Sequence, residues 1–352
     1  MIVPVHQAAS ASQPLTLGSV TLQDYPTAEQ DPGAEPMLDL AAGERARSEA
    51  KLEADLLAAL VDLGPLVVAL SGGVDSALLA VAAHRADRVK ADQVRAGHRQ
   101  PEAMKTSPSS PMLSTLAVTA SSASLASGEL DHCRDLASRF GFDWRPVDTN
   151  ELNDPRYLAN DGDRCFWCKS ALMDQLEPLA EGRTITLGVN LDDLGDHRPG
   201  QEAAAQRGAR FPLVEAGFTK ADVRRLARHW SVPVWDRPAM PCLSSRIPYG
   251  TEVSVPLLSR IDRAESVLRG LGFDDVRVRH YDETARIEVP AHQLTRAAEL
   301  GPEIVAGLGA VGYRYVTLDL AGLQSGNLNH AVRPATSGRP APSGQRRMLG
   351  TP

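Results

Sequence analysis

Apolar and polar residues alternate along the chain with two periods, and each change of period marks a new structural element. Residues 43–64 show the helical period, and residues 75–86 show it again. The apolar run 65–71 between them has the length of a buried strand and leads into a glycine turn. The first unit is therefore predicted to be helix, strand, turn and helix, the first helix burying one leucine-rich face (Leu52, Leu56, Leu57 and Leu60).

The same alternation continues as far as about residue 231. Short apolar segments predict strands, and longer segments with helical spacing predict helices. Apolar strands that alternate with helices indicate a parallel sheet covered on both faces, so the fold class is predicted to be α/β. The predicted strands are 114–120, 143–149 and 184–190, and the predicted helices are 128–141, 169–182 and 219–231.

After Cys242 the order of the elements changes. A helix, two paired strands, a helix and a last strand are predicted, which is the order of a small α+β domain. These elements are expected at 255–272, 276–281, 285–290, 292–309 and 313–320.

Composition sets the domain boundaries. Residues 1–42 and 331–352 are rich in Pro, Ser and Gly without a persistent apolar period, so both are expected to be disordered tails. Between them we expect a larger α/β domain at 43–249, with a surface insertion at 90–112, and the small domain at 250–330.

Net charge and cysteine content limit the function classes. No run of 18 apolar residues and no signal peptide is seen, so we expect a cytoplasmic protein that does not enter a membrane. The formal charge of −7 argues against a nucleic-acid partner. In a reducing compartment, the four cysteines favour thiol chemistry or metal ligation over disulfides.

The glycine turn at residues 71–76 has the features of a phosphate-binding loop. Gly72 and Gly73 allow a close backbone approach, and the N–H groups of the following helix point at the same place. Ser71 and Ser76 add hydroxyl donors, and Asp75 beside phosphates suggests Mg²⁺. A Walker A lysine is absent. The loop SGGVDS resembles that of the PP-loop ATP pyrophosphatases, which implies ATP binding, substrate adenylation and release of pyrophosphate.

Three of the cysteines form a second candidate site. Cys165 and Cys168 make a CxxC pair, and Cys242 lies far downstream at the predicted domain junction. Three thiolates with an open fourth position suit a [4Fe–4S] cluster that binds an exogenous sulfide. A redox pair, a zinc site with a further ligand and inert buried thiols remain alternatives on spacing alone. Cys133 lies in an amphipathic helix and is expected to pack in the core.

The two motifs together resemble the LarE family of sulfur transferases. The resemblance is carried by CFWCKSAL, GVNLDDLGDHRPG, FPLVEAGFTKADVRRLAR and, above all, WDRPAMPCLSSRIPYG, and it extends over about residues 45–330. It implies that the substrate is pyridinium-3,5-biscarboxylic acid mononucleotide, used in making the nickel-pincer nucleotide of lactate racemase. ATP and Mg²⁺ would adenylate a ring carboxylate, and a sulfur nucleophile would displace AMP.

The family has two sulfur sources, and the cysteine set indicates one of them. In one version, the cysteine at the position of Cys242 gives up its own sulfur. In the other, it joins a CxxC pair to hold a [4Fe–4S] cluster with a labile sulfide. All three cysteines are present here, so this chain resembles the cluster version.

The resemblance also suggests roles for individual residues. Cys242, Ser245 and Arg246 are predicted to be catalytic. Asn190, Asp192 and Asp193 follow a strand at its carboxyl end, where ligands bind, although a helix-capping turn would also explain them. Arg277 and Arg279 resemble positions that receive the mononucleotide phosphate, or they form a solvated strand face. Glu265 and Glu288 resemble acidic positions near the family's metal, or they are surface groups.

Other functions remain open at this stage. A tRNA thiolase would pair the same loop with three cysteines but should show a basic stripe or an RNA-binding module. An ATP-sensing or iron–sulfur scaffold protein would bind nucleotide without releasing pyrophosphate. For the enzyme we expect a small-molecule mononucleotide substrate, a sulfide donor and a homo-oligomer.

Overall fold

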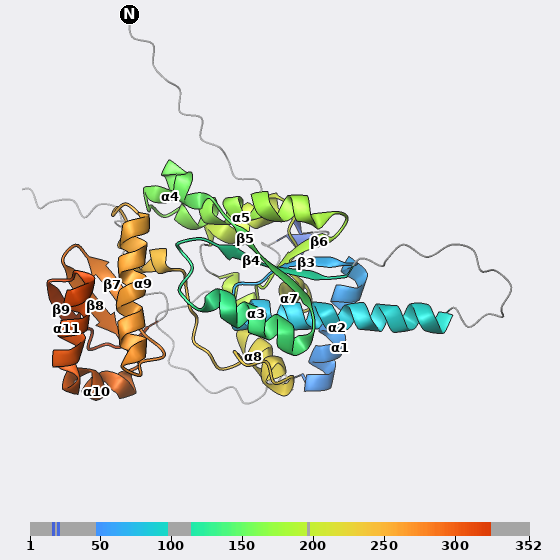
Figure 1. Cartoon of the computed structure of the whole chain (residues 1–352). Coiled ribbons are helices and arrows are strands. Elements are labelled where there is room, and N and C mark those ends of the chain that lie inside the picture. Colours follow the sequence, from blue (N-terminus) through green and yellow to red (C-terminus); the bar gives the residue numbers. More distant parts are fainter. Residues whose placement is uncertain (1–15, 18–19, 22–46, 98–113, 196–197, 325–352) are drawn as a thin grey trace, which may run out of the picture.

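A four-stranded parallel sheet forms the centre of the computed structural model (Figure 1). The structure describes residues 16–17, 20–21, 47–97, 114–195 and 198–324. The strand order is β5-β4-β3-β6, and all three pairings are parallel. The predicted α/β class is confirmed. The strands are β3 (Leu66–Ala69), β4 (Leu116–Ser121), β5 (Asp143–Asp148) and β6 (Thr184–Leu187).

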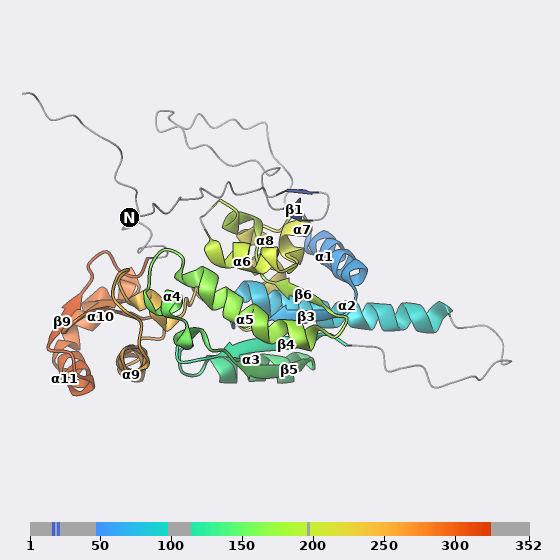
Figure 2. The ribbon, with the colours of Figure 1, turned by 90° about the horizontal axis from the view of Figure 1, so that it is seen from above.

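Both faces of this sheet are buried at β3, β4 and β6, where successive side chains point to opposite sides, whereas the side chains of the edge strand β5 are half-buried or exposed. In β3, Leu66 and Val68 belong to one core, whereas Val67 belongs to the other. The first core is covered by α1 (Glu49–Leu63), α2 (Val74–Gly97), α3 (Glu129–Phe140) and α8 (Lys220–His229). The second is covered by α5 (Arg164–Ala180) and α6 (Pro199–Gln206). In Figure 1, α5 lies on one side of the sheet and α2, α3 and α8 lie on the other, and in Figure 2, seen from above, α5 lies in front of the sheet.

Two of these helices differ from the prediction, and both differences have a local cause. Helix α2 continues through residues 90–97, where the insertion was expected to begin, because the segment up to Arg95 contains helix formers and no Gly or Pro. Helix α5 starts at Arg164 instead of residue 169, so it includes the CxxC pair. Cys165 and Cys168 thus stand three residues apart on one helical face.

Short elements connect the sheet to the rest of the chain. These are the 3₁₀ turn η2 (Glu151–Asn153), α4 (Pro155–Leu158), η3 (Leu191–Asp193), α7 (Pro212–Glu215) and η4 (Leu243–Arg246). Helices α4, α6 and α7, which the sequence pattern did not predict, each have proline at the first turn, where its missing N–H costs no hydrogen bond.

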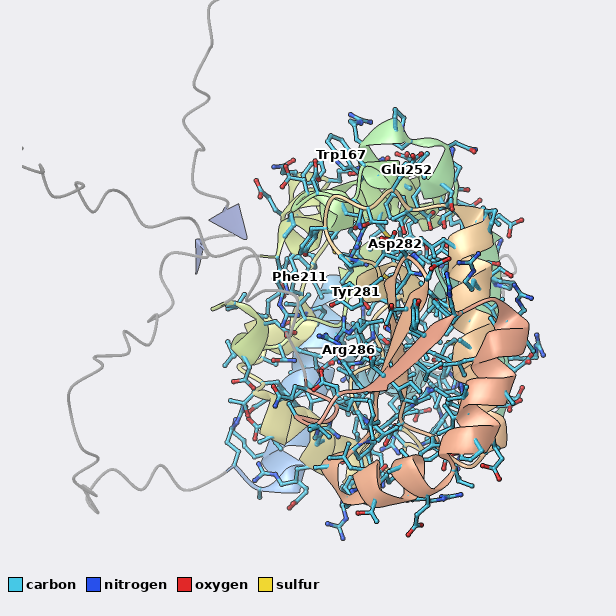
Figure 3. All side chains as sticks on the ribbon, turned by 90° about the vertical axis from the view of Figure 1, so that its left-hand side faces the viewer. Trp167, Phe211, Glu252, Tyr281, Asp282 and Arg286 are labelled. Carbon is cyan, nitrogen blue, oxygen red and sulfur yellow. The ribbon has the colours of Figure 1, made fainter. Side chains whose placement is uncertain are left out.

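A second, three-stranded sheet follows Cys242 and lies at one end of the molecule (Figure 1). Strand β7 (Arg277–Tyr281) pairs antiparallel with β8 (Thr284–Glu288), which pairs parallel with β9 (Tyr315–Leu318). Helices α9 (Val255–Gly270), α10 (Leu294–Glu299) and α11 (Gly301–Val311) accompany the sheet. In Figure 3 the sheet faces the viewer, with Tyr281 and Asp282 at the β7–β8 turn.

One predicted helix is divided in two. Residues 292–309 were expected to form a single helix, but η5 (Ala291–Gln293), α10 and α11 occupy this segment. Pro302 is the reason, because it has no N–H to donate to the carbonyl oxygen of Ala298 and its ring clashes with that turn, whereas the first turn of a new helix tolerates it. The break lets Ile304 and Leu308 of α11 join the core of the second sheet.

The two predicted tails and the predicted insertion fall mostly outside the described residues. The exceptions are residues 90–97 of the insertion and a short antiparallel pair in the N-terminal tail, β1 (Thr16–Leu17) with β2 (Val20–Thr21). Within the part of the chain that the structure describes, none of the helices has the length and apolar character needed to cross a membrane.

Two glycines of α11 test how closely this helix packs against α9. A Cβ at Gly307 would lie 2.6 Å from Cγ1 of Val267, whereas a Cβ at Gly309 would meet nothing within 4 Å. We expect Gly307→Ala to lower the free energy of unfolding by about 1–2 kcal/mol, because overpacking outweighs the gain in helix propensity. The measurement is urea unfolding of the full chain.

Gly309→Ala is the matched control. It should raise the free energy of unfolding by about 0.5–1 kcal/mol, since only helix propensity and the entropy of the unfolded chain change. Equal effects of the two substitutions would show that the contact between α9 and α11 is not tight.

Candidate functional site

The loop between β3 and α2 forms a compact cradle. Gly72 has a φ of +82°, which favours glycine, and the hydroxyl of Ser76 donates to the carbonyl oxygen of Gly73 at 3.0 Å. The backbone N–H of Ser71 donates to the Ser76 hydroxyl oxygen at 3.1 Å. These bonds hold the turn in a fixed shape at the N-terminus of α2, where helix N–H groups favour an anion.

The end of β6 approaches this cradle closely. A Cβ at Gly188 would lie 2.6 Å from the backbone nitrogen of Ser76, so only glycine fits here without a backbone shift. Asn190 follows and donates from Nδ2 to Oδ1 of Asp75 at 2.9 Å. The other carboxylate oxygen of Asp75 accepts from Nζ of Lys220 at 2.5 Å. Asp75 is therefore held by an amide and an ammonium group in this structure.

The sequence left two interpretations open for residues 190–193, a ligand-binding loop and a helix-capping turn, and the structure has features of both. They form a capping box, in which Asn190 accepts from the N–H of Asp192 and Asp193 accepts from the N–H of Asn190. Asp193 also faces a cavity and pairs with Arg198 at 2.9 Å. Burial raises the pKa of the Asp193 carboxyl, although Arg198 opposes the change. The loop is thus a turn that also faces the site.

Two cavities meet at the cradle. The first, of about 330 Å³, lies at the carboxyl ends of the parallel strands and is lined by Ser71, Ser76, Cys168 and Cys242, among others. The second, of about 220 Å³, is lined by residues 71–75 together with Lys220, Arg224 and Arg237. Ser71 lines both, so the two cavities adjoin at the glycine turn, with the thiols at the first and Lys220, Arg224 and Arg237 at the second.

The three cysteines of the second motif are free, and two of them line the first cavity. Cys168 and Cys242 line it, and Cys165 is exposed one turn earlier on α5. Burial raises the pKa of Cys168 to about 12, with a further contribution from the negative charge of Cys242. A cation bound to the Cys168 thiolate would instead lower this pKa.

Among the described residues, no group of three His, Cys, Asp or Glu side chains could hold a metal ion. The arrangement therefore does not suit one small ion as it stands. A four-iron cluster attaches each thiolate to a different iron and so needs its ligands farther apart. Cys168 and Cys242 at one cavity, with Cys165 one helical turn away, are by their chemistry three of the donors that such a cluster uses.

Hydrogen bonds fix the segment that carries Cys242. The N–H of Leu243 donates to the carbonyl oxygen of Ser124 at 2.8 Å. The hydroxyl groups of Ser244 and Tyr157 lie 2.5 Å apart inside the protein. Nη1 of Arg164, the residue before Cys165, donates to the carbonyl oxygen of Ser244 at 2.8 Å. Arg164 therefore links the CxxC helix to the Cys242 segment.

Ser245 and Arg246, which are predicted to be catalytic, also help to hold the Cys242 segment in place. Arg246 is fully buried, pairs with Glu265 at 2.8 Å and donates to the carbonyl oxygens of Pro241 and Cys242. It also donates to the hydroxyl of Ser245 at 3.0 Å. Its guanidinium thus holds the loop in position, and the catalytic role predicted for Arg246 stays a prediction.

The predicted phosphate and metal residues are buried rather than solvated. Arg279 pairs with Glu288 at 2.9 Å and donates to the carbonyl oxygen of Ser245, so Glu265 and Glu288 both face guanidinium groups. Arg277 donates to two backbone carbonyls, yet its Nε has no partner among the described residues. Burial and the neighbouring Arg246 and Arg279 lower the pKa of Arg277 to about 10. The alternative prediction, that Arg277 and Arg279 form a solvated strand face, is therefore wrong.

Sequence reasoning missed several residues that the structure brings to the site. Lys220 lies in FTKADVRRLAR, one of the segments that carry the family resemblance, and its position as the first residue of α8 is a signal that could have identified it. Tyr157 and Arg164 carry no signal in the sequence, because their hydrogen-bond partners come from distant segments. Glu151 cannot be told from a surface carboxylate by its sequence. Gly188 could have been found as the glycine that follows a buried strand.

Comparison with known proteins gives relatives over most of the chain, although no family model matches it. An uncharacterized protein of Synechocystis sp. is 41% identical over 290 residues, which is 81% of this chain and 98% of that protein. An uncharacterized protein of Methanocaldococcus jannaschii is 22% identical over 258 residues, or 72% of this chain and 89% of that protein.

A third relative has an assigned activity. The pyridinium-3,5-bisthiocarboxylic acid mononucleotide synthase of Lactiplantibacillus plantarum is 34% identical over 286 residues, which is 80% of this chain and 95% of that enzyme. At this identity and coverage, the chain belongs to the LarE family, in which that synthase is found.

Proposed function

We propose that this protein is an ATP-dependent sulfur transferase that adenylates and thiolates the carboxylates of pyridinium-3,5-biscarboxylic acid mononucleotide. The observation that carries the proposal is the shared cavity, in which Cys168 and Cys242 stand beside Ser71 and Ser76 of the cradle. A sulfur nucleophile and an activated carboxylate need this proximity to react. The assigned activity of the relative supports the choice of substrate.

The first half-reaction uses the cradle. A ring carboxylate oxygen attacks the α-phosphorus of ATP, the bond to the bridging oxygen breaks, and pyrophosphate leaves. Catalysis of this step consists mainly of positioning and charge neutralisation. The turn at residues 71–76 and the cavity lined by Lys220, Arg224 and Arg237 would hold the departing phosphates. Mg²⁺ would be held between the phosphates and the carboxylate of Asp75, which is a proposal from their chemistry.

The second half-reaction takes place at the cysteine side. A sulfur nucleophile attacks the carbonyl carbon of the acyl adenylate, AMP leaves, and a thiocarboxylate remains after release. Cys165, Cys168 and Cys242 would hold a [4Fe–4S] cluster that supplies a labile sulfide. The network of Arg164, Ser244 and Tyr157 would keep Cys242 at a fixed distance from α5.

The buried cations would bind the other end of the substrate. Arg277 has an unpartnered Nε in the protein interior, which is a costly arrangement unless an anion satisfies it. The mononucleotide phosphate is the proposed anion, as the family resemblance suggests.

We further propose, from the composition and the family resemblance, that the protein is a cytoplasmic homo-oligomer and that it takes its sulfide from a separate donor.

The proposed reaction is tested by coupling two measurements. Pyrophosphate release from ATP should require the pyridinium substrate, because the carboxylate is the nucleophile. Whole-protein mass spectrometry before and after turnover should then show an unchanged polypeptide mass, since the cluster rather than Cys242 supplies sulfur. Loss of the elements of H₂S from Cys242 would identify a sacrificial cysteine instead, and substrate-independent pyrophosphate release would contradict the adenylation step.

The cluster is tested by colour and turnover number. Anaerobically reconstituted protein should be brown, and Cys165→Ala should lose both the colour and multiple turnovers, because one of three thiolates is removed. Cys133→Ala is the control, since Cys133 is buried in the core beside α2 and lies outside the cavity of Cys168 and Cys242. A brown Cys165→Ala protein would exclude the three-cysteine site.

The role of Lys220 is tested by ATP binding. Lys220→Gln should weaken the affinity for ATP by about 10- to 100-fold, which corresponds to about 1.5–3 kcal/mol for a charge-assisted hydrogen bond. Lys51→Gln removes an exposed lysine that is paired with Asp55 and should leave ATP binding unchanged. Titration calorimetry distinguishes the two, and equal affinities would show that Lys220 only orders Asp75.

A further inference from the structure

Glu151 is a buried carboxylate for which the reaction described above has no use. It begins the turn η2, just after β5, and therefore stands at the carboxyl edge of the parallel sheet. The residue is 2% exposed. Its Oε2 atom has no hydrogen-bond partner among the described residues. A buried charge without a partner is costly, and in folded proteins such a group is usually paired.

Glu151 lines the cavity that holds the thiols, and it also borders a second hollow beside Arg156 and Trp167. It lines the thiol cavity together with Cys168 and Cys242, and its charge acts on Cys168. Lys169 lines the same cavity, but no ion pair joins Lys169 to Glu151 among the residues that the structure describes. The cavity therefore favours a ligand that brings positive charge.

Two components of the proposed reaction are cationic, the pyridinium ring and Mg²⁺. Mg²⁺ demands several oxygen ligands in octahedral geometry. The other carboxylate of the cavity, Asp193, is paired with Arg198. An N-substituted pyridinium carries no N–H and spreads its charge over an aromatic ring, so it needs a nearby anion but no directed hydrogen bond. Leu125 and Leu172 supply apolar wall for such a ring.

We propose that Glu151 pairs with the positively charged pyridinium ring of the substrate and makes the site selective for the cationic ring over a neutral one. The inference rests on the proposed function and adds a specificity-determining residue to it. The pairing places the ring in the cavity of Cys168 and Cys242, with its carboxylates directed at the cradle.

The test is calorimetric binding to the full chain without ATP or Mg²⁺. The two ligands are the pyridinium biscarboxylate mononucleotide and its 1,4-dihydropyridine form, which keeps the carboxylates and the phosphate but has a neutral ring. Glu151→Gln should weaken binding of the cationic ligand on the order of 10- to 100-fold, because a buried charge pair is lost. Binding of the neutral ligand should change by less than about threefold, since only uncharged contacts remain.

Three controls make the result specific. Glu252→Gln removes an exposed carboxylate, labelled in Figure 3, and should change neither affinity. Glu151→Asp keeps the charge and should keep the preference for the cationic ring. The affinity of Glu151→Gln for ATP and its urea midpoint should match those of the unsubstituted protein, which shows that the variant is folded.

Different outcomes overturn different claims. An equal loss for both ligands would mean that Glu151 acts through shape, and an effect confined to ATP or Mg²⁺ would assign it to the nucleotide. Either result would refute the ring pairing while leaving the proposed sulfur transfer intact. If the unsubstituted protein neither binds nor thiolates the pyridinium mononucleotide, the proposed function fails as well.

Discussion

The buried ion pair between Arg246 and Glu265 is the interaction on which the geometry of the site depends. Both side chains are fully buried, and the pair joins the segment of Cys242 to helix α9. Glu265 also accepts from the N–H of Val278 in β7, which ties the second sheet to the same point. A buried pair gives little net stability, because desolvation offsets the attraction. Its contribution here is to fix position, since Nη1 of the same guanidinium donates to the backbone carbonyl oxygens of Pro241 and Cys242 and to the hydroxyl of Ser245.

A second set of polar contacts holds the other side of the same segment. Nδ2 of Asn160 donates to the carbonyl oxygens of Pro248 and Thr251, both at 2.8 Å, and Arg164 reaches Ser244. Leu243 and Ile247 pack with residues of α9 and with Tyr157 between these polar groups. The Cys242 segment is therefore clamped between the CxxC helix and α9. Side chains held in this way lose little entropy when a ligand arrives, which is the requirement for a preorganised site.

The sequence predicts the parts of this site that depend on local pattern. The strands of the parallel sheet, the glycine turn and the cysteine set could be read from spacing, because periodicity and backbone conformation are local properties. The start of α5 was misplaced because Asp161, Gly162 and Asp163 gave no clear cap, and its N-cap Asp163 makes no side-chain capping bond. The pairing of Arg246 with Glu265 and of Lys220 with Asp75 could not be foreseen. Such pairs arise only when tertiary packing joins distant segments, so exposed and buried arginines look alike in a sequence.

The division of the site into two cavities has a chemical consequence for the proposed reaction. Displacement at the α-phosphorus requires the attacking and leaving oxygens to lie roughly in line on opposite sides. The glycine turn provides two such sides, with thiols and Glu151 in one cavity and Lys220, Arg224 and Arg237 in the other. A carboxylate that enters from the thiol side would expel pyrophosphate toward the cations. The acyl adenylate would then remain in the cavity of Cys168 and Cys242, so sulfur could reach the carbonyl carbon without passing the departing phosphates.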